Sequence, residues 1–312
     1  MPLDVGIIGL PDSGKTALFN ALTHGGAQVH DRKEHVGMAP IADERLPQVA
    51  AVEHARKITP ATIRVVDVPG TGPQLLGNLR QVDALLMVVR NPAQVEELRL
   101  ELLVADRDHV EKRLDRVRTQ AKSGDPQLRR EADELERLLA HVESGGSVGD
   151  YPGELPPGLD TLMTKPVVVV ENATGTVAGD SPGQFLGIDL ELEAELAELD
   201  EEEAAAFRDG GRSALDEVAL RLKEALDLVT FFTAGDKEAR AWTLRNGQTA
   251  LEAAATIHTD IARGFIRCEV IRWDDLVASG SHSEAARKGL QRLEGKEYVV
   301  ADGDVLNVRF NV

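Results

Sequence analysis

Gly9-Leu-Pro-Asp-Ser-Gly-Lys-Thr16 is the stretch that decides the fold, because it has the form G-x-x-x-x-G-K-S/T. An apolar run at residues 3–9 leads into it and is typical of a buried strand. Residues 15–23 follow, with apolar side chains at helical spacing. A strand, a glycine-containing loop and a helix in this order form a loop that surrounds phosphate groups. The sequence therefore predicts an α/β fold of the P-loop nucleoside-triphosphate-binding class.

The residues of this loop have separate expected roles. Glycines let backbone N–H groups turn toward phosphate oxygens, and the helix N-terminus adds the positive end of a dipole. Lys15 is expected to reach the β- and γ-phosphates, and the Thr16 hydroxyl is expected to bind Mg²⁺. The predicted phosphate-binding residues are Gly9, Asp12, Ser13, Gly14, Lys15, Thr16 and Ala17, together with Gly70 further along the chain.

A second motif, Asp67-Val-Pro-Gly70, has the form D-x-x-G and follows the strand-like residues 61–67. Such a tetrapeptide is common in turns, but its place at the end of a strand downstream of a P-loop favours a role in the site. We expect Asp67 to approach Mg²⁺, directly or through water, and the Gly70 N–H to face the γ-phosphate.

The rest of the predicted sheet surrounds an insertion. Residues 84–90 and 166–170 are nearly continuous apolar runs, which are typical of parallel strands covered on both faces. Between them, residues 103–117 and 128–142 carry apolar side chains at helical spacing, joined by Ser123-Gly-Asp-Pro126. This pattern predicts an antiparallel helical hairpin, whose charged faces serve either as a solvated surface or as a partner-docking arm.

The C-terminal part of the chain changes character. Short strand-like runs at 231–233, 241–244, 265–273, 297–300 and 305–312 accompany a helical pattern at 249–261, which predicts an α+β module of β-grasp type. An acidic stretch at 191–203 is expected to be helical. The predicted domains are a P-loop domain at 1–91 and 164–228, an inserted hairpin and loop at 92–163, and the β-grasp module at 229–312.

Composition limits the class of protein. A length of 312 residues predicts about two domains at roughly 150 residues each. The net charge of −18 disfavours broad capture of polyanions, so DNA is not an expected partner, although a local basic patch can still face RNA. We expect no membrane-spanning segment and no signal peptide, and the single Cys268 fits a reducing compartment. A cytoplasmic protein is expected.

The chain resembles the YchF subfamily of Obg-type GTPases over nearly its whole length. The resemblance implies a G domain, a helical hairpin insertion and a C-terminal TGS domain. It also implies an NTPase that associates with ribosomes through the TGS domain and hairpin, and a preference for ATP over GTP. The resembling stretches are 9–23, Asp43-Glu-Arg-Leu46, 193–203, Thr230-Phe-Phe-Thr-Ala-Gly235, Ala241-Trp-Thr243, Ile257-His-Thr-Asp260, Gly264-Phe-Ile-Arg267, Leu293-Glu-Gly-Lys296, Asp302-Gly-Asp304 and Phe310-Asn-Val312.

Three departures from that family bear on activity. Family members carry a switch-I threonine that completes the Mg²⁺ shell, whereas residues 24–58 contain neither serine nor threonine. The glycine-rich switch II is abbreviated here to residues 71–78. The base-reading motif N-x-x-E appears as Asn172-Ala-Thr-Gly175, which leaves Asn172 as the predicted base contact and no carboxylate for guanine.

Two functions follow from these features. The first is an ATP- or GTP-binding switch protein with slow Mg²⁺-dependent hydrolysis on or near the ribosome. The second is a catalytically degenerate module that binds nucleotide, RNA or the ribosome without turnover. His258, Trp242, Trp273 and Cys268 are interpreted as structural residues of the C-terminal module, and the sequence shows no His and Cys metal cluster.

Overall fold

The computed structural model describes residues 3–25, 35–67, 73–122, 124–173, 179–181, 185–196, 199, 201–207 and 212–311. The chain packs into two compact units. The first unit contains Leu3–Gly37 and Val65–Ala214, and the second contains Met38–Arg64 and Leu215–Val312. The predicted bounds of the three domains follow the chain rather than this packing, and they stay a prediction.

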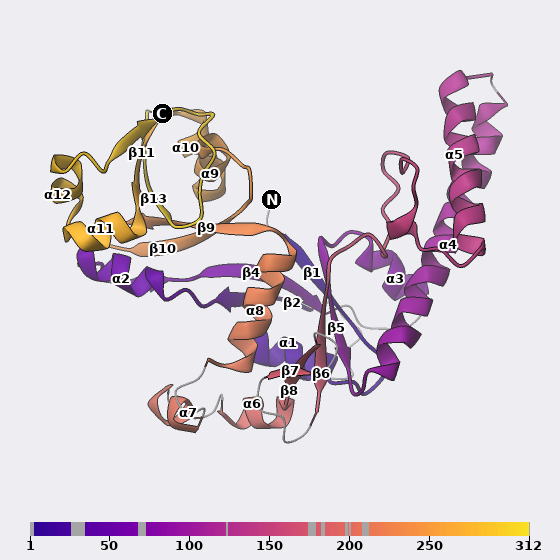
Figure 1. The fold of residues 1–312 in the computed structure, drawn as a ribbon, viewed down its shortest axis with the longest axis horizontal. Helices are drawn as coiled ribbons and strands as arrows, with labels where there is room; N and C mark the ends of the chain where they lie inside the picture. Colours follow the sequence, from indigo (N-terminus) through magenta and orange to yellow (C-terminus); the bar gives the residue numbers. More distant parts are fainter. Residues whose placement is uncertain are drawn as a thin grey trace. The chain divides into compact units, whose positions relative to one another are not determined.

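A seven-stranded sheet runs in the order β2-β4-β1-β5-β6-β8-β7 (Figure 1). The strands β1, β5, β6 and β8 pair in parallel, and β7 is antiparallel at the edge. Every residue of β5 is buried, as the apolar run predicted. The strands are β1 (Asp4–Ile8), β2 (His35–Ile41), β4 (Ala61–Asp67), β5 (Ala84–Val89), β6 (Val167–Asn172), β7 (Gly179–Ser181) and β8 (Phe185–Ile188).

The helices of the first unit include the predicted hairpin, formed by α4 and α5 (Figure 1). The hairpin has its own apolar core, in which Val110 and Leu114 of α4 pack with Leu135 of α5. The acidic stretch at 191–203, predicted as one helix, is divided between α6 and α7. These helices are α1 (Lys15–Thr23), α3 (Pro73–Leu79), α4 (Ala93–Ala121), α5 (Pro126–Glu143), a 3-10 turn η1 (Val148–Asp150), α6 (Leu190–Leu196) and α7 (Glu201–Phe207).

A six-stranded sheet of the second unit runs in the order β12-β11-β13-β9-β10-β3. The edge strand β3 comes from the N-terminal part of the chain and pairs in parallel with β10, with Ile58 opposite Ala239. The strands are β3 (Ile58–Thr59), β9 (Leu228–Ala234), β10 (Ala239–Arg245), β11 (Phe265–Arg272), β12 (Arg292–Glu294) and β13 (Asp304–Phe310).

Several helices of this part contact the six-stranded sheet, among them α9, α10 and α11. Phe231, Cys268 and Leu306 of the strands form one apolar core with Ala253 and Ala254 of α9. Helix α2 contacts β9, β10 and α11. The β-rich C-terminal module is therefore confirmed. The helices are α2 (Arg45–Val52), α8 (Ala214–Ala225), α9 (Ala250–Ile257), α10 (Thr259–Arg263), α11 (Trp273–Ser279) and α12 (His282–Arg287).

Two local predictions for this module were wrong. Residues 297–300 form no strand, because their backbone contacts the start of α9 instead: Ala250 N–H donates to the Tyr298 carbonyl at 2.8 Å. The predicted helix 249–261 breaks at His258, whose backbone is extended and whose Nδ1 accepts the Asp260 N–H at 3.1 Å. In the part of the chain that is described, no helix combines the length and apolar character that crossing a membrane requires.

Candidate nucleotide-binding site

The phosphate loop connects the end of β1 to the start of α1. Asp12 and Gly14 adopt left-handed backbone angles, with φ of 60° and 103°. Gly14, which has no side chain, occupies the N-cap of α1, so the N–H groups of the first helical turn remain available to a ligand. The loop and the helix start therefore form an anion site at the carboxyl end of β1.

Two glycines of the loop are required by its packing. A Cβ atom on Gly9 would lie 2.4 Å from the Val88 carbonyl oxygen and 2.5 Å from Ser13 Oγ. One on Gly14 would lie 2.6 Å from Nδ2 of Asn172. At Gly9 the close atom is a backbone oxygen that cannot move aside, and at Gly14 the φ of 103° adds an angle that other residues rarely adopt, which explains in physical terms why the motif has glycine at both positions.

Lys15 lies against the loop from the first position of α1. Its Nζ donates to the carbonyl oxygens of Gly9 at 2.8 Å and Leu10 at 2.9 Å. Burial lowers the pKa of Lys15, while the carboxylates of Asp67 and Asp12 raise it. A bound polyphosphate would oppose the burial effect further, because a nearby anion favours the charged ammonium.

Thr16 and Asp67 come together although 51 positions separate them. The Thr16 hydroxyl donates to Asp67 Oδ2 at 3.1 Å, and Asp67 is only 5% exposed at the end of β4. A hydroxyl and a carboxylate beside a phosphate loop are oxygen ligands of the type that Mg²⁺ prefers. The pair therefore fits Mg²⁺, and the assignment of Thr16 and Asp67 as its protein ligands stays a prediction.

Asn172 supports the loop directly. It ends β6, and its Nδ2 donates to the Ser13 carbonyl at 3.1 Å, so the amide holds the loop in place. Its predicted contact with the base stays a prediction. Gly70 and Thr71 lie outside the described residues, as do Thr174 and Gly175. Among the described side chains, Ser13 Oγ is buried without a hydrogen-bond partner inside the loop.

Sequence reasoning missed one neighbour of this loop, Arg90, and the cap of α6, a helix that contacts α1. The Nε of Arg90 donates to the Asp12 carbonyl at 2.7 Å. Asp189 caps α6 by accepting the N–H groups of Glu191 and Leu192, each at 3.1 Å. Arg90 directly follows a parallel strand, whose carboxyl end faces the ligand site in such sheets. That rule would have identified it, and the capping pattern Asp-Leu-Glu would have identified the start of α6.

The other singled-out side chains have structural contacts in the second unit. Burial raises the pKa of Cys268 to about 12, so this thiol is an inert core group. Trp242 stacks on Phe231 with ring centroids 6.4 Å apart, and its Nε1 donates to Thr233 Oγ1 at 2.9 Å. His258 caps a helix, as described above.

The loop between β1 and α1, with Lys15 folded over it and Thr16 beside Asp67, defines the class: a P-loop nucleotide-binding protein. Residues 4–129 match the family described as 50S ribosome-binding GTPase. Residues 228–311 match the family YchF-GTPase_C, described as a protein of unknown function. Relatives from other organisms match the chain over its full length. The Ribosome-binding ATPase YchF of Haemophilus ducreyi is 35% identical over 363 residues, and that of Bacillus subtilis is 34% identical over 366, with 100% of both chains covered in each case.

The chain belongs to the YchF family. The structure of the Schizosaccharomyces pombe YchF GTPase has the same fold, with a TM-score of 0.82 over 98% of this chain and 97% of that one, at 24% identity. A GTP-binding protein from Pyrococcus horikoshii OT3 matches with a TM-score of 0.59 over 99% and 100% of the two chains, at 15% identity. Because the alignment to the Haemophilus relative spans 363 positions, this chain of 312 residues is a shortened member.

Proposed function

We propose that this protein binds ATP or GTP together with Mg²⁺ and hydrolyses the γ-phosphate slowly. The observation that carries the proposal is the convergence of Lys15, Thr16 and Asp67 on one loop at the ends of β1 and β4. Phosphoryl transfer needs mainly positioning and neutralisation of charge, and these residues provide both.

Each group has a separate part in the proposed reaction. Lys15 and the N–H groups at the start of α1 neutralise charge on the β- and γ-phosphates as water attacks in line. Thr16 and Asp67 hold the metal, and bound Mg²⁺ supplies further positive charge to the phosphate oxygens. Thr71 follows Gly70, where ordinary GTPases have a glutamine that positions water. Turnover is therefore expected on the order of 10⁻⁴ to 10⁻³ per second.

The choice of base is expected to favour ATP over GTP. A guanine site needs a carboxylate that pairs with two ring N–H donors, and such pairing gives strong discrimination. Gly175 occupies the sequence position where that carboxylate is expected, so strong selection of guanine has no source in the motif. Asn172 remains the proposed base contact beside the loop.

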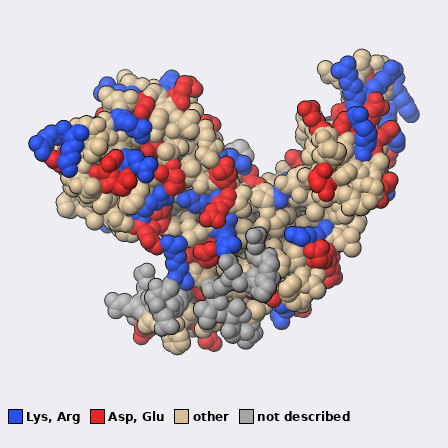
Figure 2. All heavy atoms as spheres, viewed as in Figure 1, with Lys and Arg blue, Asp and Glu red and all other residues tan. Residues whose placement is uncertain are grey.

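Association with the ribosome is the proposed cellular role, through the C-terminal module and the hairpin. The curated relatives are named ribosome-binding ATPases. The far end of the hairpin gathers basic side chains on a protein of net charge −18 (Figure 2). Such a local patch can contact RNA, because distant charges are screened beyond about 8–10 Å. The basic residues of this hairpin tip are Arg116, Arg118, Lys122, Arg129 and Arg130. A cytoplasmic location, with no membrane or DNA partner, fits this role.

Calorimetric titration with ATP, GTP and their non-hydrolysable analogues, with and without Mg²⁺, tests the proposal together with a steady-state phosphate-release assay. We expect Mg²⁺-dependent binding, weak base selection and turnover near the slow rates given above. Turnover above about one per second without a partner would show that the active site is more complete than proposed. Binding of GTP a hundredfold tighter than ATP would refute the base assignment.

The absence of serine and threonine from residues 24–58 favours a second candidate, a nucleotide-binding module without hydrolysis. Such a module would use nucleotide as a structural cofactor and act through its C-terminal part. The same experiments separate the two functions: the module binds nucleotide in the calorimeter and releases no phosphate over many hours, whereas the switch protein does both.

A further inference from the structure

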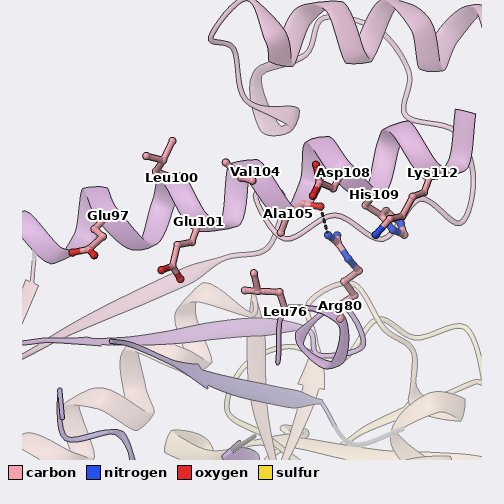
Figure 3. A pocket seen from close by; sticks show the side chains of 11 residues that line it. Leu76, Arg80, Glu97, Leu100, Glu101, Val104, Ala105, Asp108, His109 and Lys112 are labelled. Carbon is pink, nitrogen blue, oxygen red and sulfur yellow. Dashed lines mark hydrogen bonds between the residues drawn. The ribbon is translucent and has the colours of Figure 1, made fainter. Parts of the chain in front are cut away.

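A groove of about 640 Å³ lies between α3 and α4 in the first unit (Figure 3). None of its lining residues belongs to the phosphate loop or to the Thr16 and Asp67 pair. Leu76 of α3 forms one wall, and the other wall is a continuous stretch of α4 from Glu97 to Lys112. The groove therefore belongs to no site assigned so far.

The two exposed apolar side chains of the groove have no role in the core, whereas Leu76 belongs to the core and is 8% exposed. Leu100 is 61% exposed and Val104 is 51% exposed, and they lie one helical turn apart on the same face of α4. The core contacts of α4 are made by Leu98 and Leu102, each 1% exposed. Since the helix already buries one apolar stripe, the second stripe is surplus to folding, and such a surface marks an interaction site.

Acidic side chains accompany this second stripe. Glu97 and Glu101 both line the groove, again one turn apart (Figure 3). Neither has a cationic partner in the described part of the chain. Nearby carboxylates do: Glu96 pairs with Arg99 at 3.1 Å, and Asp108 pairs with Arg107 at 3.0 Å. The groove thus presents two exposed carboxylates that are available to pair with cationic groups of a partner.

The basic groups of the groove do not cancel this charge. The guanidinium of Arg80 is committed to the fully buried Asp106, with Nη1 2.6 Å from Oδ1, and to the Asp160 carbonyl. Burial lowers the pKa of His109, which favours its neutral form. Lys112 is exposed and lies at the opposite end of the groove from Glu97. The charge pattern is therefore directional, acidic at one end and basic at the other.

We propose that this groove docks an amphipathic α-helix of a partner protein, with lysine or arginine set against Glu97 and Glu101. Apolar side chains of that helix would cover Leu76, Leu100 and Val104, in the helix-in-groove mode of recognition. The stretch from Glu97 to Lys112 spans about 22 Å at 1.5 Å per residue, which corresponds to about four turns of the partner. An acidic residue at the far end of the partner would face Lys112. Polyphosphates and RNA do not fit this groove, because the negative charges of Glu97 and Glu101 repel them.

A synthetic helix tests the proposal on the full-length protein. The probe is a fluorescein-labelled, stapled peptide of about 15 residues. It carries leucines on one face, two lysines one turn apart at one end, and a glutamate at the other. A second probe has glutamates in place of the two lysines. Fluorescence anisotropy measures the affinity of each, and circular dichroism confirms that every protein variant is folded.

The expected results distinguish binding in the groove from nonspecific hydrophobic binding elsewhere on the protein. Leu100→Ser should weaken the lysine probe about fivefold, since about half of a leucine's burial energy is lost. Glu97→Lys with Glu101→Lys should weaken it about tenfold and should strengthen binding of the glutamate probe. Glu96→Lys, on the same helix but outside the groove, should change neither. The proposal is overturned if the lysine probe shows no saturable binding up to about 1 mM, or if its affinity is the same for wild type and the groove variants.

Discussion

Lys15 has the clearest individual role at the scale of single residues. Its ammonium is held over the loop by two carbonyl oxygens, and in the proposed complex it contacts the β- and γ-phosphates. We expect Lys15→Ala to bind ATP about 10- to 100-fold more weakly, because a charge-assisted contact is lost. Calorimetry measures the loss of affinity. Lys112→Ala is the control, because it removes the same positive charge at a position outside the loop. An unchanged affinity in Lys15→Ala would refute the placement of the phosphates.

Thr16 and Asp67 are expected to act as one unit. In the wild type, Mg²⁺ should strengthen nucleotide binding, whereas Thr16→Ala and Asp67→Asn should each remove most of that increment and leave Mg²⁺-free binding nearly intact. The double variant should lose little more than either single one, since residues that share one metal are not additive. Titrations with and without Mg²⁺ measure these differences. Additive losses in the double variant would argue against a shared metal.

The geometry of the loop was predictable because its signals are local. The loop, its lysine and its hydroxyl lie within one run of eight residues, and the backbone rules for glycine and helix termini apply to any such run. The contact of Asn172 with the Ser13 carbonyl was not predictable as such, because 159 positions separate the two residues. A pattern in the sequence identifies residue types, whereas a support contact of this kind depends on strand order.

At the scale of secondary-structure elements, a local helix cap stabilises the hairpin. The Asp125 side chain accepts the Gln127 N–H at 2.8 Å, and Pro126 occupies the first turn of α5. Asp125→Ala should destabilise this helix start by about 1 kcal/mol, the usual cost of losing a cap. Hydrogen exchange should show faster exchange in the first turn of α5, whereas Asp133→Ala, exposed on the same helix, should leave that turn unchanged. Equal protection in both variants would mean that the cap contributes nothing.

Elements with local signals were predicted, and elements that depend on distant partners were not. Gly124, Asp125 and Pro126 indicate a helix stop and start that need no other part of the chain. Residues 297–300 have strand-like composition, yet their backbone serves the N-terminus of α9, which periodicity does not reveal. Strand β3 is too short to predict, since Ile58 and Thr59 become a strand by pairing with β10.

At the scale of the whole molecule, Asp302 links parts of the second unit that are far apart in the sequence. It pairs with Arg45 of α2 and accepts the Thr230 N–H at 2.8 Å. Burial raises the pKa of Asp302, but the bonds from Arg45 and Thr230 and the charge of Lys223 outweigh it, so that the pKa lies below 3.8. The ionised form is thus favoured in the folded state. The resulting stability is present above pH 3.8 and is lost as the pH falls through the folded-state pKa.

The corresponding prediction is a pH-dependent loss of stability in Asp302→Asn. At pH 7 the free energy of unfolding of this variant should be lower than that of wild type by at most about 1 kcal/mol. The loss is small because the carboxylate is 43% exposed and solvent partly screens its ion pair. The difference from wild type should shrink below about pH 3.8. Thermal unfolding at a series of pH values measures it, with Glu297→Gln as an exposed control. A difference that is constant with pH would exclude the ion pair as its source.

The hairpin tip provides the prediction for the proposed ribosome contact. Reversing Arg129 and Arg130 to glutamate should reduce co-sedimentation with ribosomes and weaken its dependence on salt, because two phosphate-facing charges are lost. Glu96→Lys, a charge reversal on α4 outside the tip, should sediment like wild type. Sucrose gradients with ATP, GTP and no nucleotide measure both. A protein that stays at the top of the gradient in every nucleotide state would refute the ribosomal role.

Residues Met38–Arg64 pack with the C-terminal part of the chain although they belong to the N-terminal part in sequence. Helix α2 buries Leu46 and Val49 in that unit, and β3 occupies the open edge of β10. A fragment beginning near residue 228, where the C-terminal family match starts, would lack both α2 and β3. It would expose the unpaired edge of β10. Such a fragment is expected to self-associate. The C-terminal module therefore cannot be grafted onto another protein by a single crossover: recombination has to transfer both segments or neither.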